Sequence, residues 1–302
     1  MSNPVAIGEH IAEVLALDGA VVALESTIFS ELGLPAPHNR EALSRCVAAV
    51  RAGGAEPALT AVLDGRPTLG VDEAVHDVVC GPARKVASRD LGIAAAQRWP
   101  YGATTVSASL TLAAACGVRS FATGGIGGVH RGAGESGDVS ADLDGLARHQ
   151  VVTVSAGAKV FLDLPRTVEH LETLSVPILG WRCDEFPAFH ARSSGIPLAT
   201  TVNDAEELAG IASTHWRLGG GGVLVVAPVP EADAVDLDDV LAASTEAIAV
   251  TEATGVRGPA VTPAVLERLM ELTDGRAIGA NLSLAENNAA IAAEIAVALS
   301  AV

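Results

Sequence analysis

Lysine is nearly absent from this chain of 302 residues, in which Lys85 and Lys159 stand against seventeen arginines. Arginine stays protonated, whereas a desolvated lysine can lose its proton and become a nucleophilic amine. A sequence that uses arginine for almost all of its positive charge therefore draws attention to the two positions at which it keeps lysine. Two solvated lysines kept by chance, or a lysine kept for its chemistry, are about equally compatible with this feature alone.

Paired cysteines and long apolar runs are also missing. Cys46, Cys80, Cys116 and Cys183 lie far apart, and no Cys-x-x-Cys pair occurs. This spacing argues against a zinc site and a disulfide framework, and it favours reduced thiols in a cytoplasmic protein. The N-terminus lacks a basic segment followed by an apolar stretch, so we expect no signal peptide. No uninterrupted apolar run is long enough to span a bilayer, so we expect no membrane partner.

Positive charge as a whole is scarce, because 36 acidic residues outweigh 19 basic ones and give a net charge of −17. A strongly acidic protein repels phosphate backbones, so we expect no nucleic-acid partner. An anionic small molecule stays compatible with this charge, because local backbone N–H groups and a few cations can outweigh a distant field. Aromatic residues make up only 3% of the chain, and much of its apolar half is alanine and valine. This composition is typical of a globular protein.

Short apolar runs alternate with longer helical patterns along the chain, which predicts an α/β fold. We expect a layered fold in a single domain over residues 1–302. The predicted strands are rich in Val, Ile and Leu and lie at residues 21–24, 58–63, 120–123, 151–155, 177–179 and 223–227. The predicted helices lie at residues 40–52, 106–116, 141–149, 167–174, 205–218, 237–254, 263–272 and 284–299.

The densest motif is a glycine-rich run, TGGIGGVHRG, over residues 123–132. It follows a predicted strand, but His130 occupies the third position of the G-x-G-x-x-G dinucleotide fingerprint, so the fingerprint fails. Glycines at this density let the backbone approach a ligand closely, and His130 and Arg131 add donors for an anion. Loops at strand ends are where ligand sites form in α/β proteins, so we interpret this run as part of a site.

Three further segments carry polar groups, and each segment is compatible with two different roles. Asp138, Asp142 and Asp144 have a spacing that suits Mg²⁺ or Mn²⁺, although Asp142 equally fits the first turn of a helix. Glu25 ends an apolar strand. Burial there would raise the pKa of its carboxyl, which suits a general acid, but the carboxylate could equally form an ion pair with an arginine. Residues 102–107 precede a helix and contain Thr104 and Thr105, which fit an anion site or a simple N-cap.

Taken together, these segments resemble the signature blocks of the pseudouridine-5′-phosphate glycosidase family, in the expected order and with near-expected spacing. The glycine–His–Arg run and the Ala-Gly-Ala-Lys run are specific, whereas Glu-Ser-Thr and Thr-Thr are common. The resemblance extends from Glu25 to the last predicted helix, and it implies three layers, α/β/α, around a central sheet that is largely parallel or mixed. The blocks are Glu25-Ser26-Thr27, Lys85-Val86 with Arg89-Asp90, Ala103-Thr104-Thr105-Val106, residues 124–132, Asp138-x-Ser140-Ala141-Asp142-Leu143 and Ala156-Gly157-Ala158-Lys159.

The resemblance implies a role for each matching residue. Lys159 would be the nucleophile that attacks ribose C1′ and forms a covalent adduct with the ring-opened sugar, and Glu25 would be the proton donor. Asp138 would hold a Mn²⁺ ion that is otherwise bound mainly by water. Asn281 is a weaker candidate for the uracil edge. Substrate contacts are implied for Lys85, Val106, Ser140, Ala141 and Asp142.

The implied substrate is pseudouridine 5′-phosphate, which would be cleaved reversibly to uracil and ribose 5-phosphate by a homotrimer. Two other functions fit the same residues. A Schiff-base lyase or aldolase acting on another sugar phosphate would use the same lysine, and a non-catalytic sensor would bind a phosphorylated nucleoside without turnover. The presence of Glu25, Lys85 and Lys159 argues against a pure binding protein, because such a protein needs no nucleophilic amine.

Overall fold

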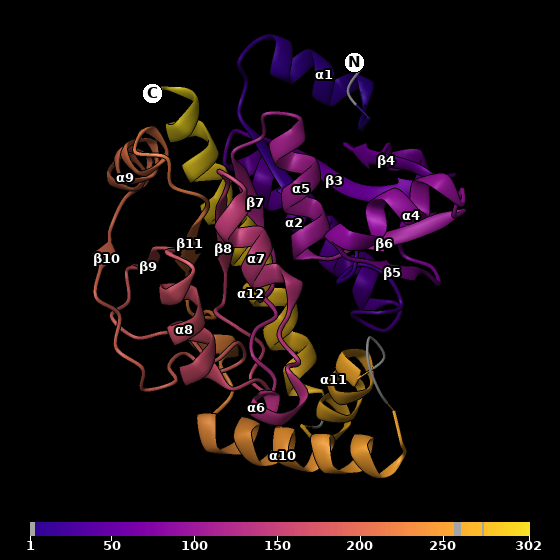
Figure 1. The fold of residues 1–302 in the computed structure, drawn as a ribbon, viewed down its shortest axis with the longest axis vertical. Helices are drawn as coiled ribbons and strands as arrows, with labels where there is room; N and C mark the ends of the chain where they lie inside the picture. Colours follow the sequence, from indigo (N-terminus) through magenta and orange to yellow (C-terminus); the bar gives the residue numbers. More distant parts are fainter. Residues whose placement is uncertain (1–3, 257–260, 274) are drawn as a thin grey trace.

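The computed structural model describes residues 4–256, 261–273 and 275–302, and these form a sheet flanked by helices (Figure 1). The strands are β1 (Ala6–Ile7), β2 (Val21–Leu24), β3 (Glu56–Leu63), β4 (Arg66–Leu69), β5 (Arg84–Val86), β6 (Tyr101–Thr104), β7 (Ser120–Ala122), β8 (Val152–Ser155), β9 (Ile178–Trp181), β10 (Thr201–Val202) and β11 (Val223–Val226). The helices are α1 (Glu9–Ala16), α2 (His38–Ala52), α3 (His76–Val79), α4 (Leu91–Ala96), α5 (Val106–Ala115), α6 (Ala133–Ser136), α7 (Ala141–Arg148), α8 (Leu164–Thr173), α9 (Ala205–Arg217), α10 (Leu237–Ala253), α11 (Val261–Leu272) and α12 (Arg276–Ser300).

The strands of the described part form one sheet in the order β1-β4-β3-β2-β7-β8-β11-β9-β10, with β6 added to β3 and β5 to β6. Most neighbours are parallel, and the antiparallel pairs are β3 with β4 and β3 with β6. The sheet is therefore mixed and mainly parallel, and the predicted α/β class is confirmed. The central strands β2, β8 and β11 are buried along their whole length, as expected for strands covered on both faces.

Each predicted strand is present, but several short strands were not predicted from the sequence. They include β4, β5 and β6, which hold few consecutive apolar residues. A local signal for β4 does exist, because Asp64 and Gly65 join it to β3 with φ of 48° and 73°. Asp-Gly with two positive φ values is the turn that closes a two-residue hairpin.

Helix α12 packs along strands β2, β7 and β8. Thirteen of its 25 residues are buried, and the Ser120 hydroxyl of β7 donates to the Ala292 carbonyl 2.8 Å away. The helix begins at Arg276, eight residues before the predicted start at residue 284, so that boundary was wrong. By length and composition α12 could cross a membrane, but 56% of its most apolar window is buried inside the protein. Its apolar character therefore has an explanation in packing against the sheet.

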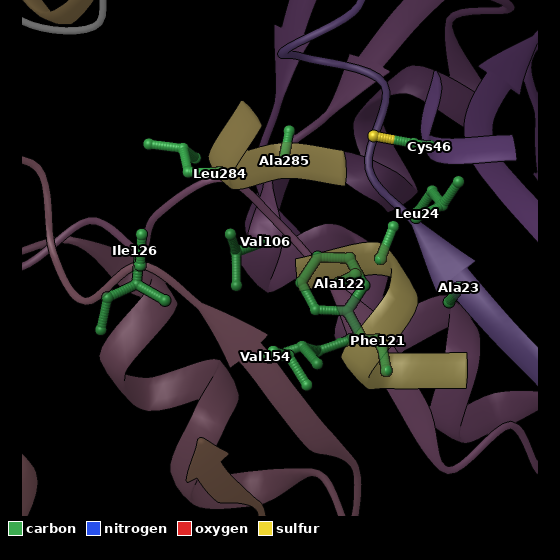
Figure 2. Close-up of a cluster of buried hydrophobic side chains, with 14 of the residues drawn as sticks. Ala23, Leu24, Cys46, Val106, Phe121, Ala122, Ile126, Val154, Leu284 and Ala285 are labelled. Carbon is green, nitrogen blue, oxygen red and sulfur yellow. The ribbon is translucent and has the colours of Figure 1, made fainter. Parts of the chain in front are cut away.

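The core lies where α5 and α12 meet the central strands (Figure 2). Phe121 in β7 is fully buried beside Val154 of β8 (Figure 2), and Leu284 of α12 belongs to the same core. Alternate residues of a strand point to opposite faces, so Phe121 points away from the face on which Ser120 meets α12. The side chain of Phe121 thus fills space between the sheet and α5.

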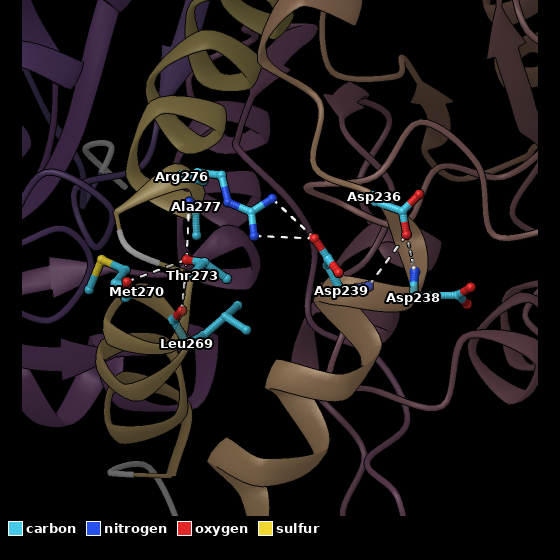
Figure 3. A network of polar contacts seen from close by, with 8 residues as sticks. All are labelled: Asp236, Asp238, Asp239, Leu269, Met270, Thr273, Arg276 and Ala277. Atoms are coloured by element: carbon cyan, nitrogen blue, oxygen red, sulfur yellow. Dashed lines mark hydrogen bonds and ion pairs between the residues drawn. The ribbon is translucent and has the colours of Figure 1, made fainter.

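A polar joint ties the three C-terminal helices together (Figure 3). Both Arg276 Nη atoms, at the start of α12, lie 3.2 Å from Asp239 Oδ2 in the first turn of α10. The Asp236 carboxylate accepts the N–H of Asp238 at 2.9 Å and caps α10, and the Thr273 hydroxyl donates to the Leu269 carbonyl near the end of α11. The Ala277 N–H of α12 donates to the same Thr273 hydroxyl at 3.3 Å, so α12 contacts both α10 and the end of α11.

We expect Phe121→Ala to lower the free energy of unfolding by about 3–5 kcal/mol, because it removes a fully buried ring and leaves a cavity. Urea denaturation would measure the change. The matched control is Leu17→Ala at a side chain that is 83% exposed, which should change stability by less than about 0.5 kcal/mol. Equal losses for the two variants would contradict the assignment of the core.

Candidate active site

The carboxyl ends of three neighbouring parallel strands open into a cavity of about 270 Å³. Glu25 follows β2, the glycine-rich run follows β7, and Lys159 lies four residues after β8. Because β2, β7 and β8 are parallel and adjacent, these three segments meet at one edge of the sheet. The order of the strands therefore assembles residues that lie far apart in the sequence.

The cavity brings together the residues for which the family resemblance implied a role, whereas Thr104, Arg131 and Asp144 do not line it. Lys85 reaches it from β5, Val106 from the start of α5, and Asn281 from α12. The segment before and within the first turn of α7 supplies the rest of the wall. The residues with an implied role all line the cavity, namely Glu25, Lys85, Val106, Asp138, Ser140, Ala141, Asp142, Lys159 and Asn281. Their shared position is a structural finding, and their individual roles stay predictions.

Glu25 is buried and has an unusual protonation equilibrium. Burial raises the pKa of its carboxyl from 4.5 to about 7, against the opposing effect of the Lys159 charge. The Thr123 hydroxyl donates a hydrogen bond to Glu25 Oε1 and also opposes the rise in pKa. The pairing of Glu25 with an arginine, which was the alternative reading, is not seen in the described part of the chain. A carboxyl that titrates near neutral pH can donate a proton and take it back.

The basic groups of the cavity repel one another. Burial lowers the pKa of Lys85 below its ordinary value, and the charge of Lys159 lowers it further. Burial likewise lowers the pKa of His130, and the two lysine charges act in the same direction. Both lysines of the chain line this one cavity, whereas arginine carries the other side-chain positive charge of the protein.

Asp142 connects two walls of the cavity through its carboxylate. Oδ1 accepts the N–H of Ser107 at 3.0 Å, in the first turn of α5, and Oδ2 accepts the N–H of Gly127 at 2.9 Å. A Cβ atom at Gly127 would lie 2.9 Å from that same oxygen and 2.3 Å from Ser140 Oγ, so only glycine admits this approach. Asp142 does lie in the first turn of α7, where Ser140 is the N-cap.

The backbone around Lys159 is fixed by pairing with the glycine-rich run. The Ala156 N–H donates to the Gly124 carbonyl at 2.9 Å, and the Lys159 N–H donates to the Ile126 carbonyl at 3.2 Å. Gly157 between them has φ of 76°, and a Cβ there would lie 2.2 Å from the Pro187 carbonyl oxygen. The Ala-Gly-Ala-Lys run therefore continues the β7–β8 pairing and directs Lys159 to the cavity.

Asp138 is an exposed carboxylate at the rim of the cavity, with Oδ2 3.9 Å from His130 Nδ1. In the described ranges, no three His, Cys, Asp or Glu side chains form a cluster that could hold a metal ion. A cage made entirely of protein ligands is therefore excluded for that part of the chain. One carboxylate with space for water does fit Mn²⁺ or Mg²⁺, which keep several waters when one or two carboxylates bind them.

Two of the proposed anion contacts are corrected by the structure. Thr104 is the last residue of strand β6, and its buried hydroxyl lies 2.8 Å from the hydroxyl of Thr60. The side chain of Thr104 therefore belongs to the core. Arg131 is exposed and does not line the cavity. Thr105 is at the N-cap position of α5, but its side chain makes no capping hydrogen bond.

Sequence reasoning missed several side chains of the site. Thr123 contacts Glu25, and Phe189 lines the cavity with a left-handed φ of 61°. Ile28, Leu34 and Met270 add apolar walls. Thr123 ends a predicted strand and so carried a signal, but only the order of the strands places it beside Glu25. Phe189 lies in a long connection after β9 and had no local signal.

Comparison with known proteins shows similarity over nearly the whole chain. The family model described as indigoidine synthase A like protein matches residues 10–298. A pseudouridine-5′-phosphate glycosidase from Methylobacterium nodulans is 49% identical over 283 residues, which cover 92% of this chain and 83% of that protein. Another from Sorangium cellulosum is 45% identical over 99% of this chain and 95% of its own length.

Solved structures give the same picture. A prealnumycin C-glycosynthase in complex with ribulose 5-phosphate has a TM-score of 0.90 and 36% identity, with 100% of this chain and 98% of that chain covered. An indigoidine synthase A-like protein from Thermotoga maritima has a TM-score of 0.87 and 34% identity, with 99% of this chain and 98% of that chain covered. The fold is thus shared with solved relatives over nearly the whole chain.

We expect Glu25→Gln to stabilise the protein at pH 8 but not at pH 4. The folded-state pKa of about 7 lies above the ordinary 4.5, so the folded protein holds this proton more tightly than the unfolded chain does. Ionisation of Glu25 therefore costs the folded state stability as pH rises from 4.5 to 7, and glutamine avoids that cost of about 3 kcal/mol. Urea denaturation at both pH values would measure the difference. An equal difference at pH 4 and pH 8 would contradict the assigned environment.

Proposed function

The chain belongs to the pseudouridine-5′-phosphate glycosidase family, and from this premise we propose that it cleaves, reversibly, the C–C glycosidic bond of pseudouridine 5′-phosphate. The products are uracil and ribose 5-phosphate. One observation carries the proposal above the others. Both lysines of the chain and a carboxyl whose pKa is about 7 lie around one cavity at the carboxyl ends of the central strands.

The reaction needs an unusual route, because its leaving group is a carbon atom. Ordinary glycosidases expel oxygen and use paired carboxylates. In the proposed route, the neutral amine of Lys159 attacks C1′, the C1′–O4′ bond breaks, and the proton that the amine loses balances the one that O4′ gains. Lysine is suited to this step, because arginine is never neutral.

The second half of the route separates the base from the sugar. Glu25 gives its proton to C5 of uracil, the electron pair of the C1′–C5 bond returns to the base, and the nitrogen of Lys159 forms an imine with C1′. Water then hydrolyses the imine, which releases ribose 5-phosphate and the free amine. A carboxyl with a pKa of about 7 holds this proton at neutral pH, whereas an ordinary glutamate does not.

The remaining residues of the cavity bind and orient the substrate. Lys85 and Arg89 are cations on the wall that Thr105 and Val106 share, and they provide positive charge for the phosphate. Ser140, Ala141 and Asp142 line the cavity beside the glycine-rich run, where backbone groups approach a ligand closely. Asn281 offers an amide for the edge of the base.

Asp138 would hold Mn²⁺ at the rim of the cavity, with water completing the coordination of the ion. When bound, the ion supplies positive charge beside an anionic substrate. His130, whose Nδ1 lies 3.9 Å from the same carboxylate, would assist Asp138 in holding the hydrated ion.

Reversibility has support of its own. The solved relative named as a C-glycosynthase shares 36% of its residues with this chain over its full length. The reverse reaction uses the same groups, because the imine of Lys159 accepts C5 of uracil and Glu25 takes the proton back. The direction of the reaction then depends only on whether pseudouridine 5′-phosphate, or uracil with ribose 5-phosphate, is in excess.

We expect Lys159→Ala to lower kcat for uracil release by about 10³-fold or more, because the variant lacks the attacking amine. Lys159→Arg should be equally inactive, since it keeps the charge but cannot become a neutral nucleophile. The assay mixes the protein with pseudouridine 5′-phosphate and Mn²⁺ and measures free uracil. Turnover within tenfold of normal in a folded Lys159→Arg variant would contradict the proposed nucleophile.

Removal of the metal ion gives a separate test. Asp138→Asn should weaken Mn²⁺ binding by at least about tenfold, because it removes the carboxylate charge. The matched control is Asp144→Asn, whose exposed carboxylate pairs with Arg148 on the surface of α7. Titration calorimetry with MnCl₂ measures affinity directly, and a chelator added to the uracil assay measures dependence. Unchanged Mn²⁺ affinity in Asp138→Asn would show that the ion binds elsewhere.

A further inference from the structure

The Glu25 carboxyl is surrounded by charges from several elements but has one hydrogen bond within the described residues. Lys159, Lys85 and Asp142 act on it through their charges, from the segments after β8, within β5 and within α7. The hydrogen bond comes from the Thr123 hydroxyl, which donates to Oε1. Charges at a distance do not fix the rotation of a carboxyl group, whereas a short directional hydrogen bond does.

Two hydrogen bonds hold the backbone of Thr123 in place. Its N–H donates to the Val154 carbonyl at 3.0 Å and so continues the pairing of β7 with β8. Its carbonyl accepts the Asn288 Nδ2 of α12 at 2.8 Å, and the same amide lies 3.3 Å from the Gly124 carbonyl. Thr123 is 4% exposed and Asn288 is fully buried. The hydroxyl thus extends from a rigid point between the sheet and α12.

We propose that Thr123 is a positioning residue, whose hydroxyl holds the carboxyl of Glu25 in the orientation from which it transfers a proton. The proposal rests on the proposed function for the identity of that transfer. It goes beyond that function by assigning a task to a residue that makes contact with Glu25 rather than with the reacting base. Asn288 supports the arrangement from α12 by fixing the backbone of Thr123.

The hydrogen bond also sets the pH range in which Glu25 keeps its proton. A donor stabilises the ionised carboxylate, so the Thr123 hydroxyl holds the pKa of Glu25 below the value that burial alone would give. Lys159 and Lys85 act in the same direction and Asp142 in the opposite one. Removal of the hydroxyl leaves those three charges in place, so the pKa of Glu25 should rise.

The test compares Thr123→Val, which removes the hydroxyl with little change in shape, with Thr123→Ser, which keeps it. A proton donor loses activity as pH rises through its pKa, so the alkaline limb of kcat for uracil release reports Glu25. In Thr123→Val this limb should move upward by about one pH unit, and kcat at pH 6 should fall about tenfold. Thr123→Ser should keep the position of the limb.

The matched control is Thr153→Val, at a buried threonine of the neighbouring strand β8 whose hydroxyl has no partner in the described part. It makes the same chemical change one strand away and should leave both kcat and the pH profile unchanged. If Thr123→Val does not fold, Thr123→Ala removes the same hydroxyl and must show the same displacement of the limb. A folded Thr123→Val or Thr123→Ala variant with the normal profile would overturn the proposal.

A second readout separates this proposal from the proposed function. Isotope-edited infrared spectroscopy of the Glu25 carboxyl follows its ionisation without any turnover. Absence of uracil release from the unsubstituted protein would refute the glycosidase reaction. The link between Thr123 and Glu25 would still be upheld by an upward shift of the Glu25 titration in Thr123→Val, and overturned by an unchanged titration.

Discussion

Parallel pairing of β2, β7 and β8 is the constraint on which the site depends. These strands lie side by side, and their carboxyl ends place Glu25, the glycine-rich run and Lys159 around one cavity. Helix α12 covers one face of the same strands and contributes Asn281 to the cavity and Asn288 to the backbone of Thr123. A shift of register between any two of these strands would separate the amine from the carboxyl.

Two carboxylates in the same cavity have different environments. Asp142 uses both oxygens to accept backbone N–H groups from Ser107 and Gly127, so it joins α5 to the glycine-rich run. Glu25 accepts one hydrogen bond, from the Thr123 hydroxyl, and is otherwise buried. Its burial raises its pKa to about 7. The burial of Glu25 and its raised pKa support the proposal that it is the proton donor, whereas the contacts of Asp142 hold two walls of the cavity together.

The sequence predicted the class of fold, the buried strands and some of the residues that line the cavity. Those predictions depended on local patterns, since apolar runs such as residues 21–24 and dense glycine over residues 123–132 are visible without a structure. The start of α12 and the strands β4, β5 and β6 were missed, because β4 to β6 are short and the first turns of α12 hold few large apolar residues. The contact of Thr123 with Glu25 could not be predicted, because it arises from strand order and joins residues 98 positions apart.

The central claim is that Lys159 becomes covalently attached to the sugar. The most direct measurement is to mix the protein with pseudouridine 5′-phosphate, reduce the mixture with borohydride, digest it and locate the modified peptide by mass spectrometry. The account predicts a reduced ribose 5-phosphate adduct on the peptide that contains Lys159, formed only when substrate is present. Uracil release without any adduct on that peptide, or an adduct on Lys85 alone, would contradict it.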